Sequence, residues 1–175
     1  MISLTSSSSK VTAIGNVSHA EGNNTTASGN YSHAEGDLTI ASGNTSHAQG
    51  SQTIASGDYS HAEGYFTISS NYGSHAEGGT QTVGPGGRAL GEASHAEGIL
   101  TTASGPASHA EGYNSIASDD SSHSEGNSTT ASGTSSHAEG ELTIASGGYS
   151  HSEGNLTTAS GSRSHAEGGF TVAGG

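Results

Sequence analysis

The chain has 175 residues, with 16 acidic residues against only three basic ones, and its formal net charge of −13 argues against nucleic acid as a partner. Leu, Ile, Val and Phe number 20 in all, so stability must come from backbone ladders and close packing of small residues rather than from a core of large side chains. Without cysteine there is no disulfide framework, and no apolar run approaches the roughly 20 residues that would insert into a membrane.

The first ten residues, with the serine run Ser6–Ser9, predict a flexible lead-in over residues 1–10. They lack the charged start and apolar stretch of a signal peptide. We therefore expect either export by another route or a fragment of a longer chain.

Residues 11–175 contain a repeat. Every histidine occupies the same place in the motif Ser-His-(Ala/Ser)-(Glu/Gln)-Gly, and the spacing is 14 residues in every interval except one of 20. Low apolar content and high charge are typical of disorder, but a disordered chain has no reason to keep one residue in register. The period predicts one supersecondary unit per repeat, stacked on the next.

One unit runs from Ser32 to Thr45 and has two halves, each with a glycine near its end. Each half predicts a strand of about five residues followed by a turn, in which glycine provides the positive φ of a tight corner. Fourteen residues are too few for a helical pair. The predicted fold class is therefore all-β, a parallel β-solenoid with 14-residue coils.

Side chains alternate across a strand, so Ser32 and Ala34 share one face of the first strand, and His33 and Glu35 share the other. Because a coil this short has a thin interior, we place the small residues inside and His and Glu outside. In the second strand we place Thr inside, with Thr82 counted in this series, and the β-branched Thr, Ile or Val outside, with Val83 counted in that one.

The interval of 20 residues predicts an insertion loop over about 79–93, which breaks the period and protrudes. Loops on rigid scaffolds often bind partners, and Pro85 and Arg88 are the candidate recognition residues here. Aromatic residues at the corners, Tyr65 and Phe66 among them, either contact carbohydrate or cover neighbouring coils.

The pattern Ser-x-Ala-x-Gly-x-x-Thr-x-Ala-Ser-Gly resembles the head repeats of trimeric autotransporter adhesins, the YadA-like or Hep/Hag left-handed parallel β-roll, over about residues 11–175. The Ser-His-Ala-Glu-Gly variant is similar to repeats in surface and phage tail-fibre proteins of Gram-positive hosts. The resemblance implies a homotrimer around a threefold axis and an extracellular, cell-surface or virion location.

In that family the two variable positions of Ser-x-Ala-x-Gly, usually Val and Ile, face the axis. The resemblance therefore implies a polar trimer interface in this chain, made of His19, Glu21, His33, Glu35, His47, Gln49, His61, Glu63, His75, Glu77, His95, Glu97, His109, Glu111, His123, Glu125, His137, Glu139, His151, Glu153, His165 and Glu167.

Two interpretations of such an interface remain open. In one, His and Glu of neighbouring chains form hydrogen-bonded ladders that fix the register, and no cofactor is required. In the other, rings of imidazoles on the axis hold a divalent transition metal, Zn or Ni. The candidate metal ligands are His19, His33, His47, His61, His75, His95, His109, His123, His137, His151 and His165.

A uniform repeat offers no unique catalytic constellation, and Ser32 and His33 point to opposite faces, so we expect no enzyme. The leading hypothesis is a structural and adhesive rod that contacts a host-surface receptor or glycan. Alternatives are an ice-binding solenoid that uses the outer Thr/Ile ladder, and a metal-binding assembly.

Overall fold

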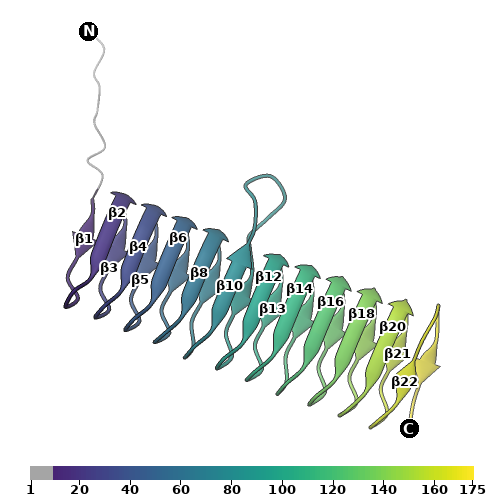
Figure 1. Ribbon diagram of the computed structural model, residues 1–175. Helices are drawn as coiled ribbons and strands as arrows, with labels where there is room; N and C mark the ends of the chain where they lie inside the picture. Colours follow the sequence, from purple (N-terminus) through teal and green to yellow (C-terminus); the bar gives the residue numbers. More distant parts are fainter. Residues whose placement is uncertain (1–9) are drawn as a thin grey trace.

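The computed structural model describes residues 10–175, which form a straight solenoid of short strands and contain no helix. The 14-residue repeat is one coil of this solenoid, and each complete coil contributes one strand to each of two parallel sheets (Figure 1). The predicted all-β parallel solenoid is confirmed. The predicted lead-in lies, apart from Lys10, outside the described residues.

The first sheet, here the long-strand sheet, has 11 strands that each begin at a histidine. Its strands are β2 (His19–Asn23), β4 (His33–Asp37), β6 (His47–Ser51), β8 (His61–Tyr65), β10 (His75–Gly78), β12 (His95–Ile99), β14 (His109–Tyr113), β16 (His123–Asn127), β18 (His137–Glu141), β20 (His151–Asn155) and β22 (His165–Ala166).

The second sheet, here the short-strand sheet, has 12 strands of two residues each. Its strands are β1 (Thr12–Ala13), β3 (Thr26–Ala27), β5 (Ile40–Ala41), β7 (Ile54–Ala55), β9 (Ile68–Ser69), β11 (Arg88–Ala89), β13 (Thr102–Ala103), β15 (Ile116–Ala117), β17 (Thr130–Ala131), β19 (Ile144–Ala145), β21 (Thr158–Ala159) and β23 (Val172–Ala173).

The second strand is shorter than the five residues predicted, because the residue two places before it has a positive φ. Leu38, ahead of β5, has a φ of 58°, outside the β region, so the strand cannot extend backwards. The N–H of Leu38 instead donates to the carbonyl of Asn23 on the preceding coil at 2.8 Å. Corner residues thus continue the ladder between coils although they are not in strands.

Neighbouring coils pair in strict register. His33 pairs with His47, Glu35 with Gln49, and Ile40 with Ile54. Since side chains alternate along a strand, this register places equivalent positions of the repeat above one another on each face along the whole rod.

The interior contains only small side chains. All the buried hydrophobic residues in the described part of the chain are alanines, and they are accompanied by fully buried serines and threonines such as Ser32 and Thr39. The Ser32 hydroxyl donates to the carbonyl of Gly29 at 2.7 Å, which satisfies one polar group in this interior. The predicted inner positions are confirmed, and His33, Glu35 and Ile40 lie outside as expected.

The two glycines of a coil have different roles. Gly36 has a φ of 113°, as predicted for a corner, whereas Gly43 does not have a positive φ. A Cβ on Gly43 would overlap the backbone carbonyl of Gly57 on the next coil. The prediction that both glycines provide a positive φ is therefore wrong for Gly43. Gly43 instead allows neighbouring coils to approach closely, because it has no side chain.

The insertion protrudes at the corner between β10 and β11 (Figure 1). It covers fewer residues than the predicted 79–93. Residues 79–86 replace the two corner residues that other coils have at this place, such as Asp37 and Leu38. The solenoid then resumes with Gly87 and with Arg88 of β11, which pairs with Ile68 and Thr102.

Thr82 and Val83 were therefore assigned wrongly. They lie exposed in the loop, and Gly87 and Arg88 occupy their predicted positions. Gly87 fits there because a Cβ would overlap the backbone of Ala96.

Candidate functional site

The histidine–glutamate face is the outer face of the long-strand sheet, made by the His and the Glu or Gln of each coil. Nine of the ten successive histidine pairs have stacked rings, with centroids 4.7–5.0 Å apart and interplanar angles of 1–8°. The stacking follows from the register, because each ring repeats at the spacing between strands.

In most coils the histidine lies beside the glutamate of its own coil, whereas the coil of His47 carries Gln49 instead. The distance from His Nε2 to Glu Oε2 is 3.4 Å for His19 and Glu21, where a hydrogen bond forms, and 3.5–3.9 Å in the other coils where the two groups pair. Residues two apart on a strand point to the same side, which explains the pairing. The sequence interpretation considered only pairs between chains and missed these contacts, although the spacing alone indicates them.

Glutamates also reach the next histidine along the rod. His47 Nε2 lies 4.0 Å from Glu35 Oε1, and His95 Nε2 lies 3.7 Å from Glu77 Oε1. In the coils between the two ends, about a third of each histidine side chain is exposed, 34–38%. The face is therefore half-buried in a single chain.

Most histidines have a buried Nε2 atom without a hydrogen-bond partner, namely His33, His47, His61, His75, His95, His109, His123, His137 and His151. The nearest carboxylates lie beyond hydrogen-bond distance. An unsatisfied buried polar atom costs free energy, so this face holds binding capacity that a single chain does not use.

Burial also affects the charge of the histidines. It lowers the pKa of His47, His61, His95 and His123, and the neighbouring histidines in the stack lower it further, against the opposite effect of nearby glutamates. These four imidazoles are therefore neutral at pH 7 and have a lone pair available as an acceptor or ligand.

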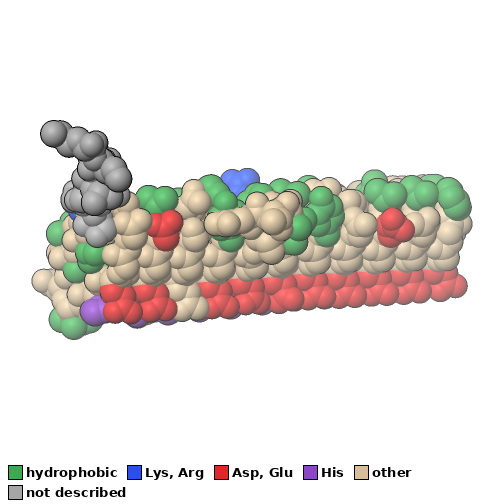
Figure 2. Space-filling view, turned by 90° about the horizontal axis from the view of Figure 1, so that it is seen from above, with side chains coloured by type: hydrophobic (Ala, Val, Ile, Leu, Met, Phe, Trp, Pro, Cys, Tyr) green, Lys and Arg blue, Asp and Glu red, His purple; other side chains and the backbone are tan. Residues whose placement is uncertain are grey.

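The glutamates form an acidic row along one long edge of the rod, with one interruption (Figure 2). The hydrogen bond to Glu63, with burial and the proximity of Glu97, raises the pKa of Glu77 to about 7, while the same hydrogen bond lowers the pKa of Glu63. Burial and the Glu111 charge raise the pKa of Glu125. Stacked carboxylates oppose one another's ionisation, so Glu77 keeps its proton up to near neutral pH.

Gln49 replaces the carboxylate in one coil. Its side-chain amide donates to the carboxylate of Glu63 on the next coil. A neutral amide thus fits the row and pairs with the neighbouring acid.

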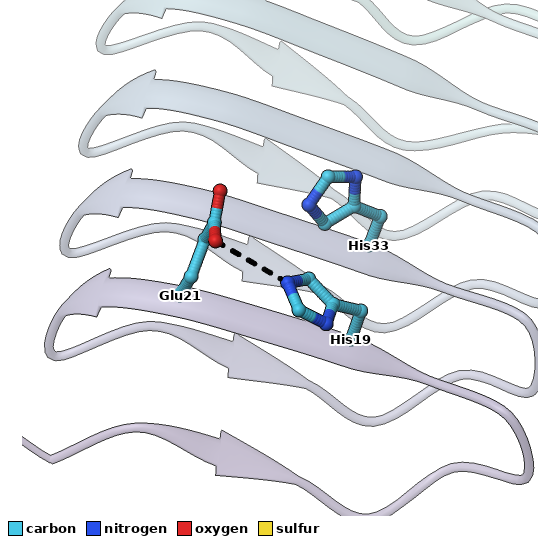
Figure 3. A group of neighbouring side chains, drawn as sticks. All are labelled: His19, Glu21 and His33. Carbon is cyan, nitrogen blue, oxygen red and sulfur yellow. Dashed lines mark hydrogen bonds and ion pairs between the residues drawn. The ribbon is translucent and has the colours of Figure 1, made fainter.

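Several groups of two histidines and a glutamate have donor atoms within 4.8 Å of one another. One group, His19, Glu21 and His33, is drawn in Figure 3. The others include His95, Glu97 and His109; His123, Glu125 and His137; His137, Glu139 and His151; and His151, Glu153 and His165. All of these lie within one chain, whereas the predicted metal rings drew on three.

The two candidate recognition residues are separated in the structure. Pro85 lies in the protruding loop and lines a pocket with Tyr65 and Phe66. Arg88 lies in β11, where its exposed side chain occupies the outer face of the short-strand sheet.

The outer face of the short-strand sheet carries the Thr/Ile ladder that motivated the ice-binding alternative. Thr26, Ile40 and Ile54 follow one another in register. Arg88 interrupts this ladder near its middle, between Ile68 and Thr102. The ladder is thus neither uniform in chemistry nor continuous.

The serines beside the histidines point into the rod. Ser32 is 1% exposed, whereas His33 lies on the outside, so the two side chains cannot form a nucleophile–base pair. Within residues 10–175, no helix is long and apolar enough to cross a membrane.

The family model of the YadA head domain repeat matches the chain in two copies, over residues 12–32, 34–68 and 96–118. Over these residues the chain is similar to YadA-like head repeats, as its motif predicts. No curated protein matches the chain. Such head repeats are parts of non-enzymatic, surface-exposed adhesins that typically form trimers, and the match supports a structural segment of that type.

Proposed function

We propose that the chain is a non-catalytic structural and adhesive rod that forms a homotrimer, with the histidine–glutamate face on the threefold axis. The observation that carries this proposal is the row of nine buried, unpartnered histidine Nε2 atoms on one face. A second and a third copy of the same face would supply acceptors and would exclude water from the half-buried side chains.

The shape of the face also supports an interface between identical chains. Ten steps of about 4.8 Å make a stripe about 48 Å long in which every coil presents the same groups. Three such stripes can pair layer by layer. Unlike in the interpretation drawn from the sequence, the ladders alone would not fix the register, because a slip by one coil would leave groups unpaired only at the ends. Register would then depend on irregular layers such as that of Gln49.

The rod would serve as a spacer or a head segment of a surface fibre, on a cell or on a phage tail, that displays binding groups towards a host receptor or glycan. The YadA-like repeats support this assignment. Its enzymatic alternative has no support in the geometry, since each coil repeats the same environment.

Light scattering at neutral pH tests the assembly. We expect a mass near 51 kDa, three times 17.1 kDa. His123→Glu would place three more carboxylates beside those of Glu125 on the axis and should lower this mass. Thr130→Glu, on the outer face of the short-strand sheet where the charged Arg88 is tolerated, should not. A wild-type mass near 17 kDa would refute the trimer.

We further propose that this face binds a divalent transition metal, Zn or Ni. Two ligands at 2.0–2.1 Å from a tetrahedral ion lie about 3.3 Å apart, close to the 3.4 Å between His19 Nε2 and Glu21 Oε2. The rings of His19 and His33 are inclined by 67° rather than stacked, so both can turn towards one ion. The terminal group of Figure 3 is therefore the favoured site.

Calorimetric titration of untagged, metal-free protein with ZnCl2 and NiCl2 tests this second proposal. We expect His19→Ala to weaken binding of the first equivalent, and the matched variant His165→Ala at the other end of the rod to leave it unchanged. The absence of heat with both metals would contradict metal binding without affecting the trimer. Ice binding is not favoured, because Arg88 breaks the ladder.

A further inference from the structure

The protruding loop and the corner before it form an open pocket of about 310 Å³, lined by Tyr65, Phe66, Thr80, Gln81, Gly84 and Pro85. We propose that this pocket binds a neutral saccharide, with a sugar ring against the aromatic side chains and its hydroxyl groups at the polar rim. The proposal deepens the adhesive function proposed above and rests on it for its biological meaning, but the pocket shares no residue with the histidine–glutamate face.

Backbone hydrogen bonds fix the shape of the loop that lines the pocket. Thr80 and Gly84 exchange two of them, from Thr80 N to Gly84 O at 2.9 Å and from Gly84 N to Thr80 O at 3.1 Å, and Val83 N donates to Thr80 Oγ1 at 3.0 Å. These bonds close the loop into a short hairpin. A loop ordered before the ligand arrives loses little conformational entropy on binding.

The base of the loop is tied to the coils on both sides. Gly86 N donates to the carbonyl of Tyr65 at 2.9 Å, and Leu100 N donates to the carbonyl of Pro85 at 2.9 Å. At other corners the carbonyl that accepts the equivalent bond belongs to a corner residue of a normal coil, as Asn23 accepts from Leu38. Here Pro85 of the inserted segment supplies that carbonyl for Leu100. The inserted segment thus takes over a place in the ladder, which fixes the pocket relative to the rod.

The floor of the pocket is aromatic. The rings of Tyr65 and Phe66 lie at 87° to each other with centroids 4.8 Å apart, and 41% of Phe66 is exposed. Other corners of this type hold at most one aromatic residue, as in Tyr113-Asn114 or Gly169-Phe170. The chain therefore places two adjacent aromatic residues at the corner directly before the one that carries the loop.

The lining has no ionisable acid or base apart from the phenol of Tyr65, although the chain carries a net charge of −13. A charged sugar or a basic peptide would find no counter-ion there. Thr80, Gln81 and the Tyr65 hydroxyl offer donors and acceptors of the kind that pair with sugar hydroxyl groups. A volume at the small end of the roughly 300–1,000 Å³ of ligand pockets suits one or two sugar rings.

Saturation-transfer NMR on the full chain tests the proposal, with the methyl glycosides of glucose, galactose, mannose and N-acetylglucosamine as probes and N-acetylneuraminic acid as a charged comparison. We expect transfer to at least one neutral glycoside. Tyr65→Ala should weaken binding about tenfold or more, since it removes one stacking surface. Tyr113→Ala, at the same position of a corner without a loop, should bind as the wild type does.

Deletion of Thr80–Pro85 provides the second variant, because it restores a 14-residue coil and should leave the fold intact while removing the pocket wall. Circular dichroism confirms folding, and light scattering reports the assembly separately, so failure of the trimer and failure of the pocket are distinguishable. The proposal is overturned if no neutral glycoside binds, if only the charged sugar binds, or if binding survives the deletion.

Discussion

At the scale of single residues, the acidic row is the feature that most directly links sequence to stability. Glu77 is faced by Glu63 and Glu97 in the row and by His95 at 3.7 Å. Its pKa, raised from 4.5 to about 7, means that the folded chain keeps a proton that the unfolded chain releases. Stability is therefore lost as the pH rises from about 4.5 through about 7.

Glu77→Gln should remove this loss. An amide can replace the protonated carboxyl beside Glu63, as the Gln49 amide does on the preceding coil, and it carries no charge at any pH. We expect a melting temperature above that of the wild type near pH 8 and a smaller difference near pH 5. Glu92→Gln, at an exposed corner, removes the same charge and should change neither value.

The histidines act in the opposite sense. Burial lowers the pKa values of His47, His61, His95 and His123 below 6.5. Their contribution to the stability of the fold is therefore complete above that pH and is lost as the pH falls. The Glu77→Gln variant should retain this loss on the acid side. If the wild type and Glu77→Gln have the same melting temperature at every pH from about 5 to 8, Glu77 does not hold a proton in the folded chain.

The inner and outer residues could be predicted because a two-residue period and a thin coil leave little choice. Thr82 and Val83 were misplaced because they imitate the Thr-Ile pair of a normal coil. Counting backwards from the next histidine finds the correct residues, since Arg88 precedes His95 by seven positions, as Ile54 precedes His61. The buried, unpartnered Nε2 atoms and the hydrogen-bonded pair Glu63–Glu77 could not be predicted, because they depend on distances of a few tenths of an ångström.

At the scale of elements, the corners determine how closely coils can stack. Gly36 combines a φ of 113° with a position where a Cβ would overlap the carbonyl of Gly50. Gly148, also at a corner, has no positive φ, and a Cβ at this position would have no heavy atom nearer than 4.0 Å.

Gly36→Ala should therefore lower the free energy of unfolding by about 3 kcal/mol or more, from backbone strain and overlap combined. Gly148→Ala should change it by less than about 0.5 kcal/mol, as is usual for surface substitutions. Urea unfolding followed by circular dichroism measures both. Similar losses in the two variants would mean that the corner at Gly36 can relax.

The lengths of the elements were only partly predictable. Nine of the 11 strands of the long-strand sheet have the expected five residues. The strands of the short-strand sheet have two, because non-glycine residues such as Leu38 adopt the left-handed region. Such residues rarely do so, and only the ladder bond between coils makes it favourable here. No local propensity indicates a conformation that a neighbouring coil imposes.

At the scale of the whole molecule, the rod is a one-dimensional array in which each coil contacts only its neighbours. Deletion of residues 109–122 removes one complete coil and brings the strand at His123 against β12 in the same register. We expect this variant to stay folded, with a modest decrease in melting temperature.

Deletion of residues 109–115 removes half a coil instead. It would bring Ile116 of the short-strand sheet into the position of His109, so the remaining seven residues could not close a coil. Thermal unfolding should then lose its single cooperative transition or shift strongly to lower temperature. If both deletions behave alike, the 14-residue coil is not the unit of stability.

The loop at residues 79–86 has a consequence for what the rod can carry. Six extra residues enter one corner, yet His75 still pairs with His95, and Ile68 with Arg88. A corner that tolerates such an addition is a place where foreign peptide can be grafted. Segments inserted at successive equivalent corners would stand about 4.8 Å apart on one edge, so the molecule could present chosen ligands at a spacing set by coil number.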